Sequence, residues 1–125
     1  MTILYQIYLY RKDNIPYEIE NIIKENVEIE NKFVSDIVHG VLEKEKELDK
    51  MIDKYMIGWT TSRLGNIDQS IFRMSVYELL YYETPNIVCI NEGIELSKKY
   101  SDEKVTGLLN GVLDKIYDLE VKDEW

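Results

Sequence analysis

The sequence has 125 residues, of which 45% are hydrophobic and 31% are charged, a balance that excludes a disordered chain and suits one globular domain over residues 1–125. The formal net charge of −9 repels nucleic acid, so any affinity for RNA has to come from a local basic patch. No apolar run approaches the roughly 20 residues that cross a bilayer, and the start does not resemble a signal peptide, so we expect a cytoplasmic protein with no membrane contact.

Hydrophobic periodicity predicts an all-α fold, since only 2 prolines and 6 glycines interrupt it. A first helix is expected over residues 2–12, with its apolar side chains on one side and a proline soon after its end. A second, short helix is expected over residues 17–26. The longest stripe of apolar positions runs over residues 30–57 and predicts one long helix.

The second half of the chain begins with a predicted turn. Two threonines, a serine and a glycine place a junction between two subdomains near residues 58–66. Apolar spacing then predicts helices over residues 67–82, 88–100 and 101–116, the last opened by a capping Asp102, and the C-terminal tail is expected to fray. Without an internal repeat or a long linker, the chain is expected to form a compact bundle of about six or seven helices.

Groups suited to catalysis or metal binding are sparse. Asp36 and His39 have the spacing of two metal ligands on one helix face, but the chain has 1 histidine and such sites need more ligands, so His39 is expected to hydrogen-bond locally. Cys89 lies in an apolar stretch, where a small core residue is its ordinary role. Glu92 and Glu95 have no phosphate-binding loop or nucleophile beside them. We therefore expect no enzyme, no bound metal and no cofactor.

Three blocks of the sequence resemble the NusB family. They are LYQ at residues 4–6, RLGNIDQSIFRMSVYELLY at residues 63–81, and INEGIELSKKY followed by LLNGVLDKI between residues 90 and 116. Their order and spacing match as well, and the resemblance covers nearly the whole chain. It implies a fold of two small helical subdomains packed side by side.

The same resemblance implies a role in transcription antitermination. Members of the NusB family pair with NusE, a small-subunit ribosomal protein, and the heterodimer binds boxA RNA within the RNA polymerase antitermination complex to support ribosomal RNA synthesis. The resemblance therefore implies an adapter with protein and RNA partners, and a homodimer stays open.

Candidate contact residues follow from the positions that match the family pattern. For contact with RNA or with the protein partner we single out Tyr5, Arg63, Asp68, Arg73 and Lys98. The alternative for Arg73, an ordinary pair with a neighbouring carboxylate, has about equal weight because such pairs are common.

Four further residues belong to the family blocks and have structural interpretations. Asn91 and Asn110 are expected to tie helix ends and backbone, Gly111 to permit close contact between helices, and Glu92 to belong to the same motif as Asn91. These structural roles compete with functional ones.

The sequence also departs from the family pattern. Family members carry an arginine-rich run ahead of the LYQ block, where this chain has Met1, Thr2 and Ile3, and a serine and an aromatic residue where this chain has Val105 and Leu108. The net charge and these departures favour an alternative, a protein-interaction or self-associating module of the same fold that does not bind RNA. A third hypothesis is a helper related to the NusB-like domain that precedes some RNA cytosine methyltransferases.

Overall fold

The structure, a computed structural model, describes residues 1–26, 32–82 and 85–121. Within these ranges the regular elements are all helical, which confirms the all-α prediction. They are α1 (Thr2–Lys12), α2 (Ile19–Asn26), α3 (Lys32–Glu43), α4 (Glu45–Tyr55), the 3₁₀ turn η1 (Thr61–Arg63), α5 (Asn66–Tyr81), α6 (Asn86–Tyr100), α7 (Glu103–Ile116) and the π-helical turn η2 (Tyr117–Val121).

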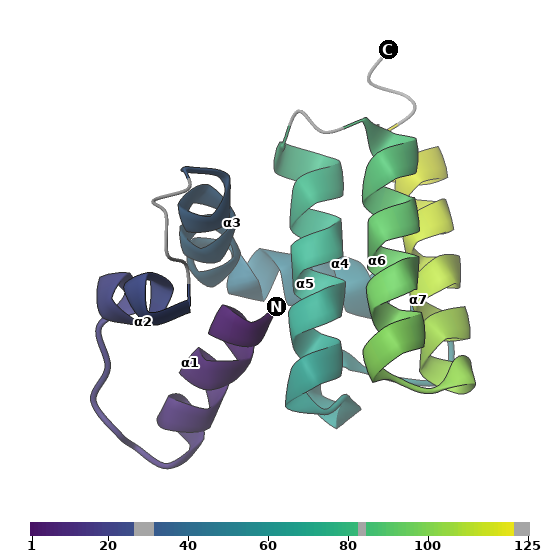
Figure 1. Ribbon diagram of the computed structural model, residues 1–125. Coiled ribbons are helices and arrows are strands. Elements are labelled where there is room, and N and C mark those ends of the chain that lie inside the picture. Colours follow the sequence, from purple (N-terminus) through teal and green to yellow (C-terminus); the bar gives the residue numbers. More distant parts are fainter. Residues whose placement is uncertain (27–31, 83–84, 122–125) are drawn as a thin grey trace.

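Helix α5 stands between the two halves of the molecule. In Figure 1, α6 and α7 run alongside α5 on one side, while α1, α2 and α3 lie on the other and α4 passes behind. The contacts agree, because α5 touches α1, α3, α4, α6 and α7. No helix in the described ranges is both long enough and apolar enough to cross a membrane.

The central position of α5 explains why it is buried nearly all round. Ile71, Phe72 and Val76 are fully enclosed, and the polar Ser70 is buried too, with its hydroxyl donating to the Asn66 carbonyl at 2.8 Å. A helix that faces protein on all sides has to be largely apolar or has to satisfy its polar groups internally. The core around it is formed by Leu4, Ile7, Val41, Leu48, Ile52, Leu109, Val112, Leu113 and Ile116.

The single long helix predicted over residues 30–57 is wrong, because the structure has two helices in its described part, residues 32–57, while residues 30–31 lie outside the described ranges. Helix α3 ends at Glu43 and α4 begins at Glu45, with Lys44 between them at φ −99° and ψ 10°. The apolar stripe continues across the break because each helix buries its own part: α3 packs on α5, and α4 packs on both α5 and α7. Tertiary packing, and not a change of pattern, therefore turns the chain at Lys44.

Other boundaries differ by a residue or two. Helix α6 begins at Asn86, two residues before the predicted start, with Pro85 preceding it as the N-cap residue. The capping of α7 is confirmed, since the Asp102 side chain accepts a hydrogen bond from the Val105 N–H at 2.9 Å. The tail that was predicted to fray comprises residues 121–125, of which only Val121 lies inside the described ranges.

Two glycines allow close approach between helices. An ideal Cβ at Gly40 on α3 would lie 2.1 Å from the ring of Tyr77 on α5, and one at Gly93 on α6 would lie 2.5 Å from the Ser75 hydroxyl, also on α5. Glycine at these positions therefore lets α3 and α6 pack against the central helix.

Candidate functional site

Arg73 is buried in an ion-pair network rather than free for a partner. Only 7% of the residue is exposed. Its Nε and Nη2 atoms donate to the two carboxylate oxygens of Asp49 at 2.7 and 2.9 Å, and its Nη1 lies 3.5 Å from Glu45. Burial alone would lower the pKa of Arg73, but the hydrogen bonds with Asp49 and the nearby Tyr8 raise it above its ordinary value. Arg73 therefore stays charged and ties α5 to α4.

The same network reaches α1 through a second arginine. Arg11 donates to both carboxylate oxygens of Glu45 at 3.1 Å. The ring of Tyr8 lies 5.6 Å from the Arg11 guanidinium carbon and 5.1 Å from that of Arg73, so both cations contact this ring. Burial raises the pKa of the Tyr8 hydroxyl, and the charge of Arg73 opposes this rise. Two cations on one tyrosine are thus neutralised by the carboxylates of α4.

A second ring with two cations lies at the junction between α4 and α5. Trp59 precedes η1 and is partly buried, and the exposed Arg63 guanidinium lies 4.0 Å from its ring centre. The Lys104 ammonium, from the first turn of α7, lies 4.9 Å from the same centre. The family pattern singled out Arg63 but neither Trp59 nor Lys104. The contact between Trp59 and Lys104 joins residues that are 45 positions apart in the chain, so local pattern does not reveal it.

No hydrogen bond or ion pair joins the remaining predicted contact residues within the described ranges. Tyr5 is partly buried on α1, and Asp68 lies in the first turn of α5. Lys98 is exposed near the end of α6 and lies 3.6 Å from Glu95, one turn earlier on the same helix. Among the residues that the structure describes, Tyr5, Asp68 and Lys98 form no hydrogen bond or ion pair with one another, with Arg63 or with Arg73.

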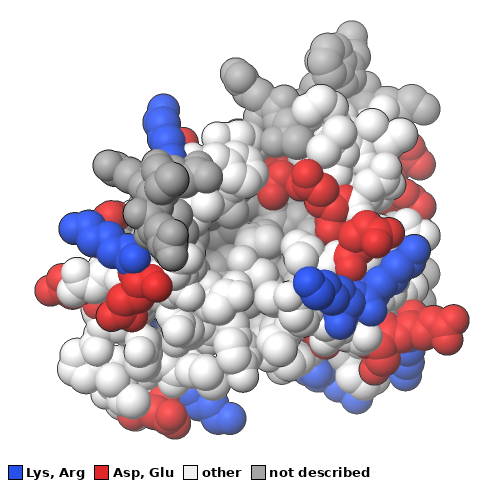
Figure 2. Space-filling view, viewed as in Figure 1, with Lys and Arg blue, Asp and Glu red and all other residues white. Residues whose placement is uncertain are grey.

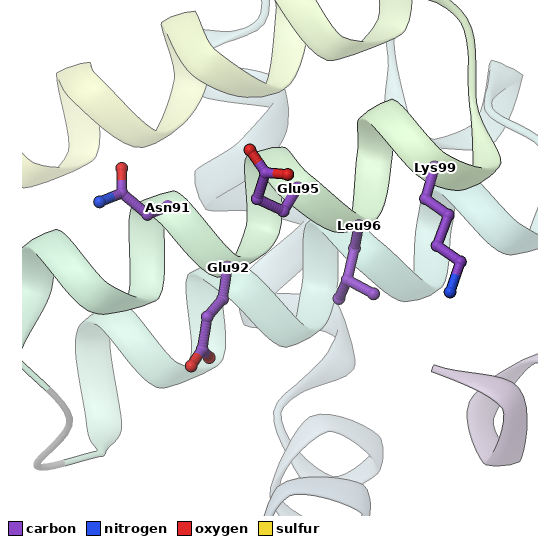
Figure 3. A pocket seen from close by; sticks show the side chains of 5 residues that line it. All are labelled: Asn91, Glu92, Glu95, Leu96 and Lys99. Carbon is purple, nitrogen blue, oxygen red and sulfur yellow. The ribbon is translucent and has the colours of Figure 1, made fainter.

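An open groove runs along α6. Its described lining comes from that helix alone and consists of Asn91, Glu92, Glu95, Leu96 and Lys99. In Figure 3 the side chains of Glu92 and Glu95 point away from each other, so these two carboxylates do not form an acid and base pair. Figure 2 shows acidic side chains along the rim of a hollow between the two halves of the molecule, with basic side chains below them.

The structural roles expected for three residues of the family blocks are wrong. Asn91 and Asn110 are exposed, and within the described ranges neither side chain makes a hydrogen bond. Gly111 is exposed as well, and a Cβ added there would meet no atom within 4 Å. The close approach of α6 to α5 occurs at Gly93 instead. Exposure of Asn91, Glu92 and Asn110 leaves their side chains available to a binding partner.

The single histidine and the single cysteine of the chain have structural surroundings. His39 is exposed and hydrogen-bonds to Glu20 on α2, so the expected hydrogen bond is present, but its partner lies on another helix and the side chain is not at the boundary of the core. Among the described residues there is no group of three or more side chains of the metal-ligating types. Cys89 is 2% exposed, as expected for a core residue, and burial together with Glu78 raises the pKa of its thiol to about 12.

Comparison with known proteins gives one consistent result. The chain matches the NusB family over residues 1–118. It is 45% identical to the transcription antitermination protein NusB of Bacillus subtilis over 85 residues, which are 67% of this chain and 65% of that protein, just under two thirds of its length. It is 39% identical to the NusB protein of Macrococcus caseolyticus over 112 residues, 86% of each chain.

Solved structures of the same kind superimpose over most of the molecule. A structure of T. maritima NusB aligns with a TM-score of 0.80 at 29% identity, covering 98% of this chain and 88% of that one. A structure of the antitermination factors NusB and NusE in complex with dsRNA aligns with a TM-score of 0.76 at 28% identity, covering 93% of this chain and 88% of the matched one.

Proposed function

Because this chain belongs to the NusB family, we propose that it is a transcription antitermination adapter, which binds a NusE-type ribosomal protein and, together with it, boxA-type RNA. The observation that carries the proposal is the likeness to the solved NusB and NusE complex with dsRNA, which extends over 93% of this chain. In this role the heterodimer joins the RNA polymerase antitermination complex and supports transcription of ribosomal RNA.

The charge of the chain supports a need for the protein partner. A net charge of −9 repels RNA, because each phosphate of the RNA backbone also carries a negative charge. The buried cation Arg73 is already neutralised by carboxylates. A partner that carries positive charge offsets this repulsion, so we expect much tighter RNA binding by the heterodimer than by this chain alone.

Helix α6 offers a surface for the protein partner. Its groove combines the apolar side chain of Leu96 with polar residues at the rim, and Ile87 near its start is 70% exposed. Protein interfaces commonly have this composition, an apolar centre with a polar border. We propose Asn91 and Glu92 as partner contacts on this helix, and keep Tyr5, Asp68 and Lys98 as further contacts for the partner or the RNA.

Calorimetry with the purified NusE-type protein of the same genome tests the first half of the proposal. We expect saturable binding at one to one, and the double variant Asn91→Ala/Glu92→Ala should weaken it. A matched control changes Asn21 and Glu25 to alanine, which are exposed on α2 and lie outside the family blocks. A wild-type chain that shows no binding heat and no complex on size-exclusion chromatography would contradict the proposal.

Gel-shift assays with boxA-type RNA test the second half. The labelled RNA is titrated with this chain, with the partner and with the mixture, and a scrambled RNA of equal length is the control. A shift that needs both proteins and the boxA-type sequence is the expected result.

The alternative, an interaction or self-associating module that does not bind RNA, is favoured by the net charge of −9 and by the departures of the sequence from the family pattern. It predicts that the heterodimer, or a homodimer seen by light scattering, leaves the RNA unshifted. A shift by the heterodimer excludes it.

A further inference from the structure

The ring of Trp59 holds two cations from different parts of the chain. The Arg63 guanidinium carbon lies 4.0 Å from the ring centre and the Lys104 ammonium lies 4.9 Å from it. Both distances fall within the range in which the negative face of an indole attracts a cation, and tryptophan is the most effective aromatic ring for this contact. We call these three residues the Trp59 cluster.

A second aromatic ring in the molecule also contacts two cations, and the comparison shows how the Trp59 cluster differs from it. Tyr8 also contacts two cations, Arg11 and Arg73, but both of these are paired with the carboxylates of Glu45 and Asp49. The Trp59 cluster has no such neutralisation: within the described ranges neither Arg63 nor Lys104 has a carboxylate oxygen within 4 Å.

The absence of a carboxylate is unexpected in this chain. It has 24 acidic residues and 15 basic ones, and Asp68, Asp102 and Glu103 lie close to the cluster in sequence without pairing with its cations. Two like charges held against one ring repel each other, so an anion that binds both lowers the energy of the arrangement.

The backbone adds positive potential at the same place. Arg63 lies just before the N-terminus of α5, where Gly65 is the N-cap residue and no side chain caps the helix. Lys104 lies in the first turn of α7, a position where the helix dipole disfavours a cation. The N-termini of α5 and α7 both lie at the lower end of the bundle in Figure 1. The carboxylates of Asp68, Asp102 and Glu103 offset part of their positive potential, so the two cations themselves remain the main attraction for an anion.

We propose that the Trp59 cluster is a contact site for the phosphate backbone of RNA, with Arg63 and Lys104 as the binding groups and Trp59 as the residue that positions them. This inference rests on the proposed function. It assigns the surface through which this acidic chain contacts the RNA phosphates. The combination of cations with an aromatic ring is typical of single-stranded nucleic acid binding.

The salt dependence of RNA binding by the heterodimer tests the proposal. Each phosphate contact to a single strand contributes about 0.7 to the slope of log affinity against log salt concentration. The double variant Arg63→Gln/Lys104→Gln should therefore lower the slope by about 1.4 and weaken binding roughly tenfold at 150 mM salt. The control variant Lys46→Gln/Lys50→Gln removes two exposed lysines of α4 with the same change in net charge, and it should leave the slope unchanged.

Two variants of Trp59 separate positioning from folding. Trp59→Leu keeps an apolar side chain against the core but removes the ring, and should lower the slope toward that of the double variant, while Trp59→Phe should restore most of it. Circular dichroism and thermal melting of each variant show whether the fold is intact. A slope that is unchanged in the folded double variant overturns the proposal whatever the Trp59 variants show.

The outcomes distinguish this inference from the proposed function. If the wild-type heterodimer does not bind RNA, the proposed function fails and this inference falls with it. If the wild type binds RNA and the double variant binds with the same slope, only the inference fails. If calorimetry shows that the double variant has lost its affinity for the NusE-type protein, the cluster is a contact for that protein, and the assignment to RNA is overturned.

Discussion

Replacing Arg73 with glutamine should destabilise the protein without removing a contact to a partner. The change deletes a two-pronged ion pair with Asp49 and leaves that carboxylate next to Glu45 with no compensating cation from α5. Breaking a fully buried pair by removing one partner costs about 3 to 5 kcal/mol. The side chain of Asp49 is 30% exposed, and water reaches it, so we expect a loss of about 2 to 3 kcal/mol.

This loss corresponds to a clear change in melting temperature. At about 2.1 cal/mol/K per residue, 1 kcal/mol shifts the midpoint of a chain of this length by roughly 4 °C, so a decrease of about 8 to 12 °C is expected. Urea unfolding followed at 222 nm gives the free energy of unfolding, provided that the transition is two-state. The single variants Arg73→Gln and Asp49→Asn and their double variant complete a cycle, in which we expect a coupling of at least about 1 kcal/mol.

The matched control is Arg63→Gln, which removes an exposed arginine without a carboxylate partner in the described part of the chain. It should change the free energy of unfolding by no more than about 1 kcal/mol, the size of a cation–π contact at an exposed site. The reasoning is refuted if Arg73→Gln is as stable as the wild type and yet loses affinity for the NusE-type protein or for RNA, because Arg73 would then be a binding residue.

Three further predictions concern packing, capping and pH. Gly40→Ala should destabilise by about 1 to 3 kcal/mol because its Cβ would lie 2.1 Å from the Tyr77 ring, and urea unfolding in a Tyr77→Leu background should show that penalty largely relieved. Asp102→Ala should lower the free energy of unfolding by about 1 kcal/mol through loss of the hydrogen bond to the Val105 N–H, a change that thermal melting would detect and that an unchanged midpoint would contradict. Burial raises the pKa of Glu78, so the native state holds its proton to higher pH than the unfolded chain does, and this contribution to stability is lost as pH rises through the folded-state pKa. Glu78→Gln should therefore be more stable than the wild type at pH 7. Unfolding curves measured at about pH 3, where the carboxyl is almost fully protonated in both states, should show the advantage gone, and an equal advantage at both pH values would contradict this.

Much of the secondary structure could be predicted from local pattern. The apolar spacing of α1, α5 and α7, and the capping residue Asp102, are features of neighbouring residues, and the structure agrees with them. The break at Lys44 could not be predicted, because the apolar positions before and after it continue one helical stripe. Only the different partners of α3 and α4 turn the chain there.

The candidate site depended more on the tertiary structure. Arg63 was noticed from the family pattern, yet its companion Lys104 comes from another helix and Trp59 gave no signal of its own. For Arg73 the sequence left two roles equally open, and the position of Asp49, 24 residues away, favours the structural one.

By itself, the sequence determined the helical class, most helix positions and the resemblance to the NusB family, because periodicity, capping and motif spacing are local properties of the chain. The tertiary structure decided which charges are neutralised. Arg11 and Arg73 meet carboxylates around Tyr8, whereas Arg63 and Lys104 meet around Trp59 without them. The physical reason is that the energy of a charge depends on its neighbours in space, and residues far apart in the chain become neighbours only when the helices pack.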